Sequence, residues 1–381
     1  MDRVTVKPKL LRWAIERSRV DFNTLVHRFP KLPDWEQGDA NPTLKQLESF
    51  AKATHTPIGF FFLAEPLAER VPIPDFRRVA GAQIHGPSPD LLDTIYLCQQ
   101  RQDWYRDYAR STGDEPRGFV GSVRINNDVI ATARQIREAI GFDVEKRRLM
   151  PTWTDALRGF IELADNLGIL VMVSGVVGSN NKRKLDPQEF RGFALADQLA
   201  PLVFINGADS KAAQMFTLAH ELAHIWLGET AVSDAEASAV PNNAIESWCN
   251  RVAAELLVPI TAFGVQYARN RPLREELDRL ARVYKVSRLV ILRRIYDSGG
   301  LSRDAFFKAY EAELDHLRAL PKGSGGDFYL TLGARASKTF ARALVVSTVE
   351  GRTPFTEAFR LLGFKKMATF SELGRTLGVA F

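Results

Sequence analysis

The chain has 381 residues, of which 45% are hydrophobic and 25% are charged, and its net charge is +6. These values are typical of globular proteins and exclude collagen-like, coiled-coil and disordered chains. There is no run of about 18 apolar residues and no apolar signal-peptide core at the start, so we expect neither a membrane span nor secretion. Two cysteines exclude a disulfide framework, and we therefore expect a cytoplasmic protein of about two to three domains.

The hydrophobic pattern predicts an α+β protein that is mostly helical and has one small sheet. Helices are expected in several pieces within 8–63, and then at 90–113, 129–141, 153–167, 210–227, 243–257 and within 261–318. Strands are expected at 169–173, 190–195 and 202–205. The strand around 190–196 is expected to be a sheet edge along which an extended substrate lies.

Four parts follow from this pattern. They are a helical domain at 1–65, a proline-rich linker and helical connector at 66–125, the domain holding the sheet at 126–320, and a small helical tail at 321–381. A glycine-rich break at 322–326 precedes the tail. Both ends of the chain are mildly basic and the middle is close to neutral, which permits nucleic-acid contact at the ends without requiring it.

The most informative motif is H-E-x-x-H at residues 220–224. On a helix, residues four apart lie on one face, so His220 and His224 can bind one Zn²⁺ ion. Glu221 is turned about 100° from His220 and flanks the metal. It is therefore placed to act as general base toward a water molecule.

A catalytic zinc site needs a third protein ligand, and five downstream carboxylates are candidates: Glu229, Asp234, Glu236, Glu246 and Glu255. Glu229 is too close to His224 in sequence to fold back comfortably. Glu246 and Glu255 are nine residues apart and lie on opposite faces of the expected helix, so at most one of them faces the metal. The small residues after Glu246 would let its helix approach the first one closely. This favours Glu246, with Glu236 as the second choice.

Several segments together resemble the ImmA/IrrE family of zinc metallopeptidase-like proteins over roughly residues 150–300. These are Arg191-Gly192-Phe193, the strand at 202–206, the motif at 220–224 with Leu227-Gly228, and the run from Glu246 to Pro259. That last run is similar to the family's E-x-x-A-N-x-F-A-A-x-L-L-x-P pattern, with Cys249 and Val252 as replacements. The resemblance implies a zincin-like fold in which His220, His224 and Glu246 bind zinc in a gluzincin-like arrangement.

The resemblance also implies an activity, namely peptide hydrolysis with Glu221 as the catalytic carboxylate. Zinc would lower the pKa of its water toward ~7 and polarise the scissile carbonyl, and Glu221 would take the water proton and pass it to the leaving amine. Members of the family cleave or inactivate a repressor and thereby switch on stress or mobile-element genes. The expected partner is thus a protein substrate, a repressor encoded nearby.

Residues 8–63 resemble a Cro/repressor-type helix-turn-helix domain of the XRE class. The matching residues are Trp35-Glu36-Gln37-Gly38, Pro42-Thr43, Leu44, Leu47, Phe50-Ala51 and Pro57. Pro30 and Pro33 fall where the groove-reading helix would begin, and a proline inside a helix costs about 3 kcal/mol. Two interpretations therefore stay open: DNA binding through a shortened helix, or a helical domain that holds a protein partner.

Two other functions compete with a regulatory zinc endopeptidase. In the first, the chain is a DNA-binding transcriptional or toxin–antitoxin regulator that uses the zinc fold as a scaffold or sensor. In the second, it is a housekeeping metallopeptidase with no regulatory link, but the N-terminal domain would then have no purpose. Two histidines and one carboxylate also suit non-haem iron, and it is the helical H-E-x-x-H spacing that favours zinc.

Overall fold

The computed structural model describes residues 3–76, 86–233, 243–319 and 335–379. They form two compact units, one built from residues 3–72 and 86–95 and the other from residues 73–76 and 96–379. The chain is mostly helical with one small mixed sheet, which confirms the predicted α+β class. The predicted glycine-rich break at 322–326 lies outside the described residues. No described helix is both long and apolar enough to cross a membrane.

The first unit is a group of short helices around its own apolar core. Its elements are α1 (Pro8–Ser18), α2 (Phe22–Arg28), α3 (Leu32–Gln37), α4 (Leu44–Ala53) and the 3₁₀ helix η1 (Ile58–Phe62). Trp35 and Phe50 are buried in the core, where their rings meet edge to face at 6.4 Å. A capping box between Thr43 and Gln46 starts α4.

Helix α3 is only six residues long, as the two prolines indicated. Pro33 lies in the first turn of α3. Backbone N–H groups there have no partner within the helix, so the missing N–H of proline costs no hydrogen bond. Gly38 ends the helix in the left-handed conformation at φ +84°. The unit is thus a folded helical domain, and its kinship to XRE-type domains stays a prediction.

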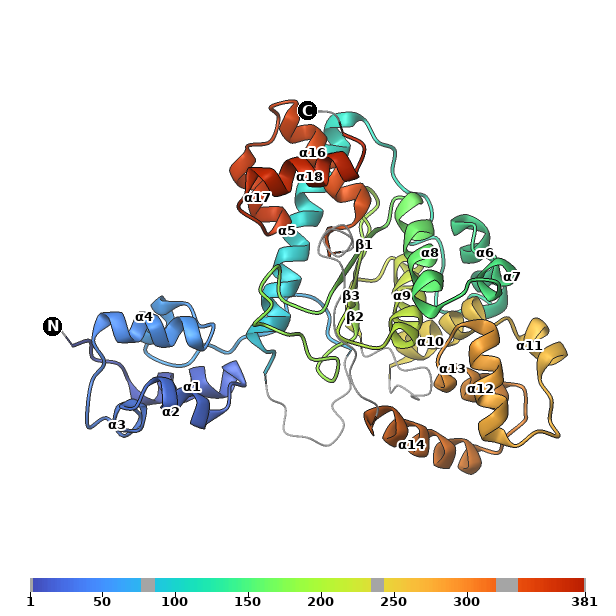
Figure 1. Cartoon of the computed structure of the whole chain (residues 1–381), viewed down its shortest axis with the longest axis horizontal. Coiled ribbons are helices and arrows are strands. Elements are labelled where there is room, and N and C mark those ends of the chain that lie inside the picture. Colours follow the sequence, from blue (N-terminus) through green and yellow to red (C-terminus); the bar gives the residue numbers. More distant parts are fainter. Residues whose placement is uncertain (1–2, 77–85, 234–242, 320–334, 380–381) are drawn as a thin grey trace. The chain divides into compact units, whose positions relative to one another are not determined.

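The second unit is built around a four-stranded sheet in the order β1-β3-β2-β4 (Figure 1). The strands are β1 (Leu170–Ser174), β2 (Gly192–Leu195), β3 (Leu202–Asn206) and β4 (Ala231–Ser233). β1 runs parallel to β3, whereas β2 runs antiparallel to both β3 and β4. The three predicted strands are therefore present, and β4 is an addition that the sequence did not indicate.

The prediction that the strand around 190–196 forms a sheet edge is wrong. β2 is an inner strand, since Gly192, Phe193 and Ala194 pair with β3 on one side and with β4 on the other. The main-chain N–H and C=O groups of β2 pair with β3 and β4, so no further strand can pair with β2. β4 is the outer strand of the named sheet on this side.

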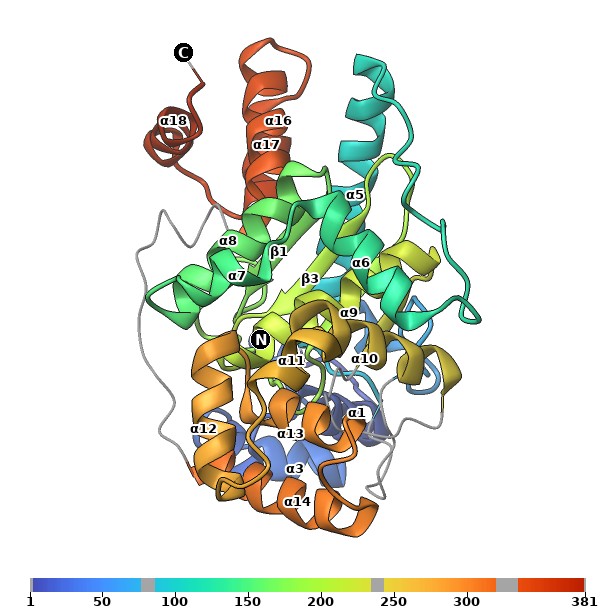
Figure 2. The same ribbon diagram turned by 90° about the vertical axis from the view of Figure 1, so that its right-hand side faces the viewer.

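Helices cover both faces of the sheet. α8 (Trp153–Asn166) and α9 (Lys211–Leu227) lie on one side, and the second-unit part of α5 (Pro89–Thr112) lies on the other (Figure 1). The remaining helices of this layer and the next are α6 (Val129–Ile140), α7 (Val144–Arg148), α10 (Ala244–Leu257), α11 (Ile260–Gln266), α12 (Leu273–Tyr284), α13 (Arg288–Asp297) and α14 (Arg303–Ala319). Figure 2 shows α12, α13 and α14 grouped together beyond α10 and α11.

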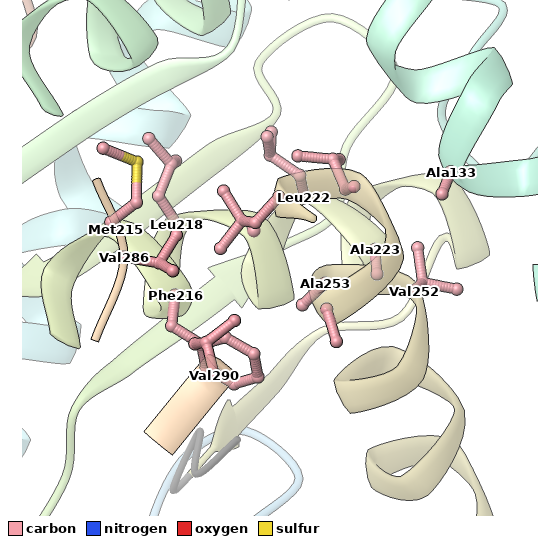
Figure 3. Packing of buried hydrophobic residues seen from close by; sticks show 14 of the residues in the cluster. Ala133, Met215, Phe216, Leu218, Leu222, Ala223, Val252, Ala253, Val286 and Val290 are labelled. Carbon is pink, nitrogen blue, oxygen red and sulfur yellow. The ribbon is translucent and has the colours of Figure 1, made fainter. Parts of the chain in front are cut away.

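The central helix α9 is buried from Gln214 to Leu227. The side chain of Ser210 accepts a hydrogen bond from the N–H of Ala213 at its start, and Gly228 at φ +74° ends it. α10 packs directly against α9, with the small residues Ala223 and Ala253 in the shared core (Figure 3). This close packing brings the start of α10 next to the H-E-x-x-H turn of α9.

Three C-terminal helices follow, and the first of them is anchored to α8 through one carboxylate. They are α16 (Lys338–Val349), α17 (Phe355–Leu362) and α18 (Met367–Thr376). Asp165 of α8 accepts hydrogen bonds from the hydroxyl of Ser337 and from the N–H and hydroxyl of Thr339, the latter two at 2.9 and 2.7 Å. Buried Arg101 of α5 adds a bond to the carbonyl oxygen of Leu361 at 2.9 Å.

We expect Asp165→Ala to lower the free energy of unfolding by about 2–3 kcal/mol, because hydrogen bonds to a charged group are lost and their donors stay buried. Urea unfolding measures this change. Glu162→Ala on the same helix is the matched control. It removes only an exposed ion pair with Lys338 and should cost less than about 1 kcal/mol. Equal losses in the two variants would contradict the anchoring role of Asp165.

Candidate metal centre

Two histidines on consecutive turns of α9 point to one place. His220 and His224 are fully buried, and their Nε2 atoms are 3.0 Å apart. The four-residue spacing of the motif produces this approach, since one helical turn separates the two side chains. The predicted pairing of the two imidazoles is therefore present in the fold.

Glu246 in the first turn of α10 completes the cluster. Its Oε1 lies 3.0 Å from Nε2 of His224, and its Oε2 lies 3.3 Å from Nε2 of His220. One atom of each of the three residues lies within 4.8 Å of the others. Two ligands of a tetrahedral zinc ion with bonds of about 2.0–2.1 Å are about 3.3 Å apart, so this donor set fits zinc in chemistry and in spacing.

Asn250 fixes which nitrogen of His220 faces the cluster. It lies one turn after Glu246 on α10, and its Oδ1 is 2.9 Å from Nδ1 of His220. A carbonyl oxygen only accepts hydrogen bonds, so Nδ1 carries the hydrogen and Nε2 turns toward Glu246. Such an outer contact orients a metal-binding histidine.

We expect Asn250→Ala to weaken zinc affinity about 10- to 100-fold, because the His220 ring loses its orienting partner. Competition with a zinc-binding dye measures the affinity. Asn126→Ala, a change at an exposed residue, should leave it unaltered. Unchanged affinity in Asn250→Ala would contradict this role.

Glu221 lies beside the cluster and is held by the sheet. The hydroxyl of Ser233, at the end of β4, donates a hydrogen bond to Oε1 of Glu221. Oε2 is buried and has no hydrogen-bond partner among the described residues. Gly192 of β2 makes room for this arrangement. A Cβ at that position would lie 2.6 Å from Cγ2 of Thr217 and 3.0 Å from Oε1 of Glu221.

Burial and mutual charge set the ionisation of these groups. Burial raises the pKa of Glu221 to about 8. Burial also acts to raise the pKa of Glu246, but His220 and His224 outweigh it and hold that pKa well below its usual range. For His220, burial is outweighed by Glu246 and the pKa is raised, whereas burial lowers the pKa of His224. The two imidazoles thus stabilise the charged form of Glu246, the form in which a carboxylate can bind a metal ion.

The other carboxylate candidates lie elsewhere. Glu255 is buried and forms an ion pair with Arg294 while accepting a hydrogen bond from the N–H of Ile260 at 3.2 Å. Glu229 is exposed and lines a separate cavity of about 440 Å³ together with Arg124. Asp234 and Glu236, the latter the second choice from the sequence, lie outside the described residues.

Sequence reasoning assigned no role to three residues around the cluster. Asn250 shares a helix face with Glu246, and that spacing was the available signal. Ser233 and Gly192 act across strand pairings that link distant parts of the chain. No local pattern marks Ser233, and the resemblance at Arg191-Gly192-Phe193 does not show what Gly192 does.

Two family models match the chain. Residues 164–296 match the Peptidase_M78 model, described as IrrE N-terminal-like domain. Residues 336–376, which span α16 to α18, match a domain of unknown function (DUF8813). No curated protein matches the chain. Neither match reaches residues 8–63.

The first match covers the sheet, α9 and α10, and so includes all four residues of the predicted site. It supports a metallopeptidase-like function and a metal, typically zinc, at the cluster of His220, His224 and Glu246. The resemblance to the ImmA/IrrE family is thereby confirmed for residues 164–296, which are similar to the IrrE N-terminal-like domain.

Proposed function

We propose that the protein is a zinc-dependent endopeptidase in which His220, His224 and Glu246 hold the metal and Glu221 is the general base. The observation that carries this proposal is the convergence of two buried imidazoles and a carboxylate on one point, with a second carboxylate beside them. Two imidazoles and a carboxylate around an accessible fourth position are the donor set of many catalytic zinc sites, which supports a bound zinc ion here.

The chain's own residues divide the work of hydrolysis. His220, His224 and Glu246 would hold a zinc ion, which would lower the pKa of water and polarise a peptide carbonyl. Glu221 accepts the proton of the attacking water and passes it to the leaving amine. Ser233 occupies Oε1 of Glu221, which leaves Oε2 to receive the proton. Asn250 keeps His220 in the orientation that binds metal.

The substrate that we propose is a repressor or another regulatory protein encoded nearby. Support comes from the likeness of residues 8–63 to repressor-type domains, because such a domain is suited to recognising a similar domain in its target. The short α3 offers a small groove-reading surface, which favours protein recognition over DNA reading.

Incubation of the zinc-loaded protein with repressors encoded nearby tests the proposal, with products identified by mass spectrometry. We expect cleavage at defined bonds, absent in Glu221→Gln. Intact repressors together with salt-dependent binding to duplex DNA would instead support the DNA-binding regulator.

A further inference from the structure

A segment from the start of the second unit pairs with the outer edge of β4. Asp75 forms a parallel bridge with Val232. The N–H of Phe76 donates to the carbonyl oxygen of Val232 at 2.9 Å, and the N–H of Val232 donates to the carbonyl oxygen of Pro74 at 2.9 Å. Residues Pro74–Phe76 thus pair with the outer edge of β4 through one parallel bridge to Val232, on the side opposite β2.

The same segment places an aromatic ring next to the metal cluster. The ring of Phe76 lies 6.3 Å from the imidazole of His224, with 30° between their planes. Ile73 is buried, whereas Pro74 and Asp75 are exposed. The apolar side chains at the two ends of the segment therefore lie against the protein, and the two between them face the solvent.

The edge that the segment covers is part of the site. Ser233, which follows Val232 on β4, donates to Glu221. An extended peptide that pairs with Val232 is therefore carried past Glu221 and His224. Addition of a strand to an exposed edge is a common mode of peptide recognition, in which main-chain bonds give affinity and side-chain pockets give specificity.

We propose that the outer edge of β4 is the substrate-binding edge of the peptidase site and that Ile73–Phe76 occupies it as an internal inhibitor. The main-chain groups of Val232 cannot serve two strands at once, so the segment leaves before a substrate binds. The position of Phe76 indicates the substrate class, an extended peptide with an aromatic or apolar side chain over His224. This inference rests on the proposed function.

Two features suit the segment to this role. Pro72 and Pro74 have no N–H to donate, and two main-chain bonds join the segment to Val232. A substrate that makes further contacts beyond Val232 can therefore replace it. Because the segment belongs to the same chain, it competes at an effective concentration on the order of millimolar.

A labelled peptide with the sequence of residues 71–78 tests the edge without any need for cleavage. Its binding is measured by fluorescence polarisation to zinc-loaded protein carrying Glu221→Gln. Phe76→Pro removes both the ring and the N–H that bonds to Val232, and we expect it to tighten binding of the peptide at least about tenfold. Phe76→Ala removes only the ring and should give a smaller gain. Phe62→Ala, at an exposed phenylalanine of η1, should bind as the unaltered protein does.

Thermal unfolding shows whether each variant is folded, and Phe76→Ala keeps the test valid if Phe76→Pro is not. Equal peptide affinity in the folded Phe76 variants and the unaltered protein would overturn the inference.

The rate of hydrolysis of an unfolded protein such as casein, measured with Glu221 intact, separates the edge assignment from the proposed function. A variant that binds the peptide tightly but cleaves nothing would leave the edge assignment standing and refute the proposed function. Cleavage at the unaltered rate with no gain in peptide binding would refute the edge assignment and leave the proposed function standing.

Discussion

Glu221→Gln is expected to reduce peptide hydrolysis about 10²- to 10⁴-fold while the zinc content stays the same. Glutamine has nearly the shape of glutamate and can still meet the hydroxyl of Ser233. It cannot accept the proton of the attacking water, so only the chemical step suffers. Initial rates on a cleaved repressor, with zinc measured in the same samples, check both halves of the prediction.

Glu138→Gln is the matched control for this variant. Glu138 is an exposed residue of α6, so its replacement should leave the rate unchanged. Full activity in Glu221→Gln would refute the assignment of Glu221 as general base. Loss of zinc in that variant would show that Glu221 supports the metal centre.

Glu255→Ala is expected to lower the free energy of unfolding by about 3–5 kcal/mol and to retain zinc. Its carboxylate pairs with Arg294 in the interior, where both side chains are nearly inaccessible to solvent. Removing the carboxylate of Glu255 leaves the positive charge of Arg294 buried with less negative charge beside it. Urea unfolding of the zinc-loaded protein measures the loss.

A double variant separates the ion pair from packing. Replacing both partners, as in Glu255→Met with Arg294→Leu, should recover much of the stability, since an apolar pair of similar size needs no charge compensation. Glu246→Ala on the same helix should instead lose the metal. Loss of zinc in Glu255→Ala would contradict the assignment of Glu255 as a structural carboxylate.

The pairing of His220 with His224 was accessible from the sequence because it depends on local geometry, whereas the approach of Glu246 depends on the packing of α10 against α9. The four-residue spacing on a helix brings the two histidines together whatever surrounds them. The nine-residue spacing from Glu246 to Glu255 likewise separates those carboxylates, and the structure pairs Glu255 with Arg294. Helical periodicity thus decided most of the donor set.

The edge of the sheet was not accessible in the same way. β4 has three residues, too few for an alternating pattern to appear. Its pairing with β2, and that of Ile73–Phe76 with β4, join segments far apart in the chain. The incorrect edge assignment of the strand at 190–196 arose because these partners have no local signature.

The central claim is that this chain holds a metal at His220, His224 and Glu246, and elemental analysis tests it most directly. Protein purified without added metal is compared with His220→Ala and Glu246→Ala. We expect about one zinc per unaltered chain and almost none in either variant. Unaltered protein that contains no zinc and takes up none when it is supplied would contradict the claim.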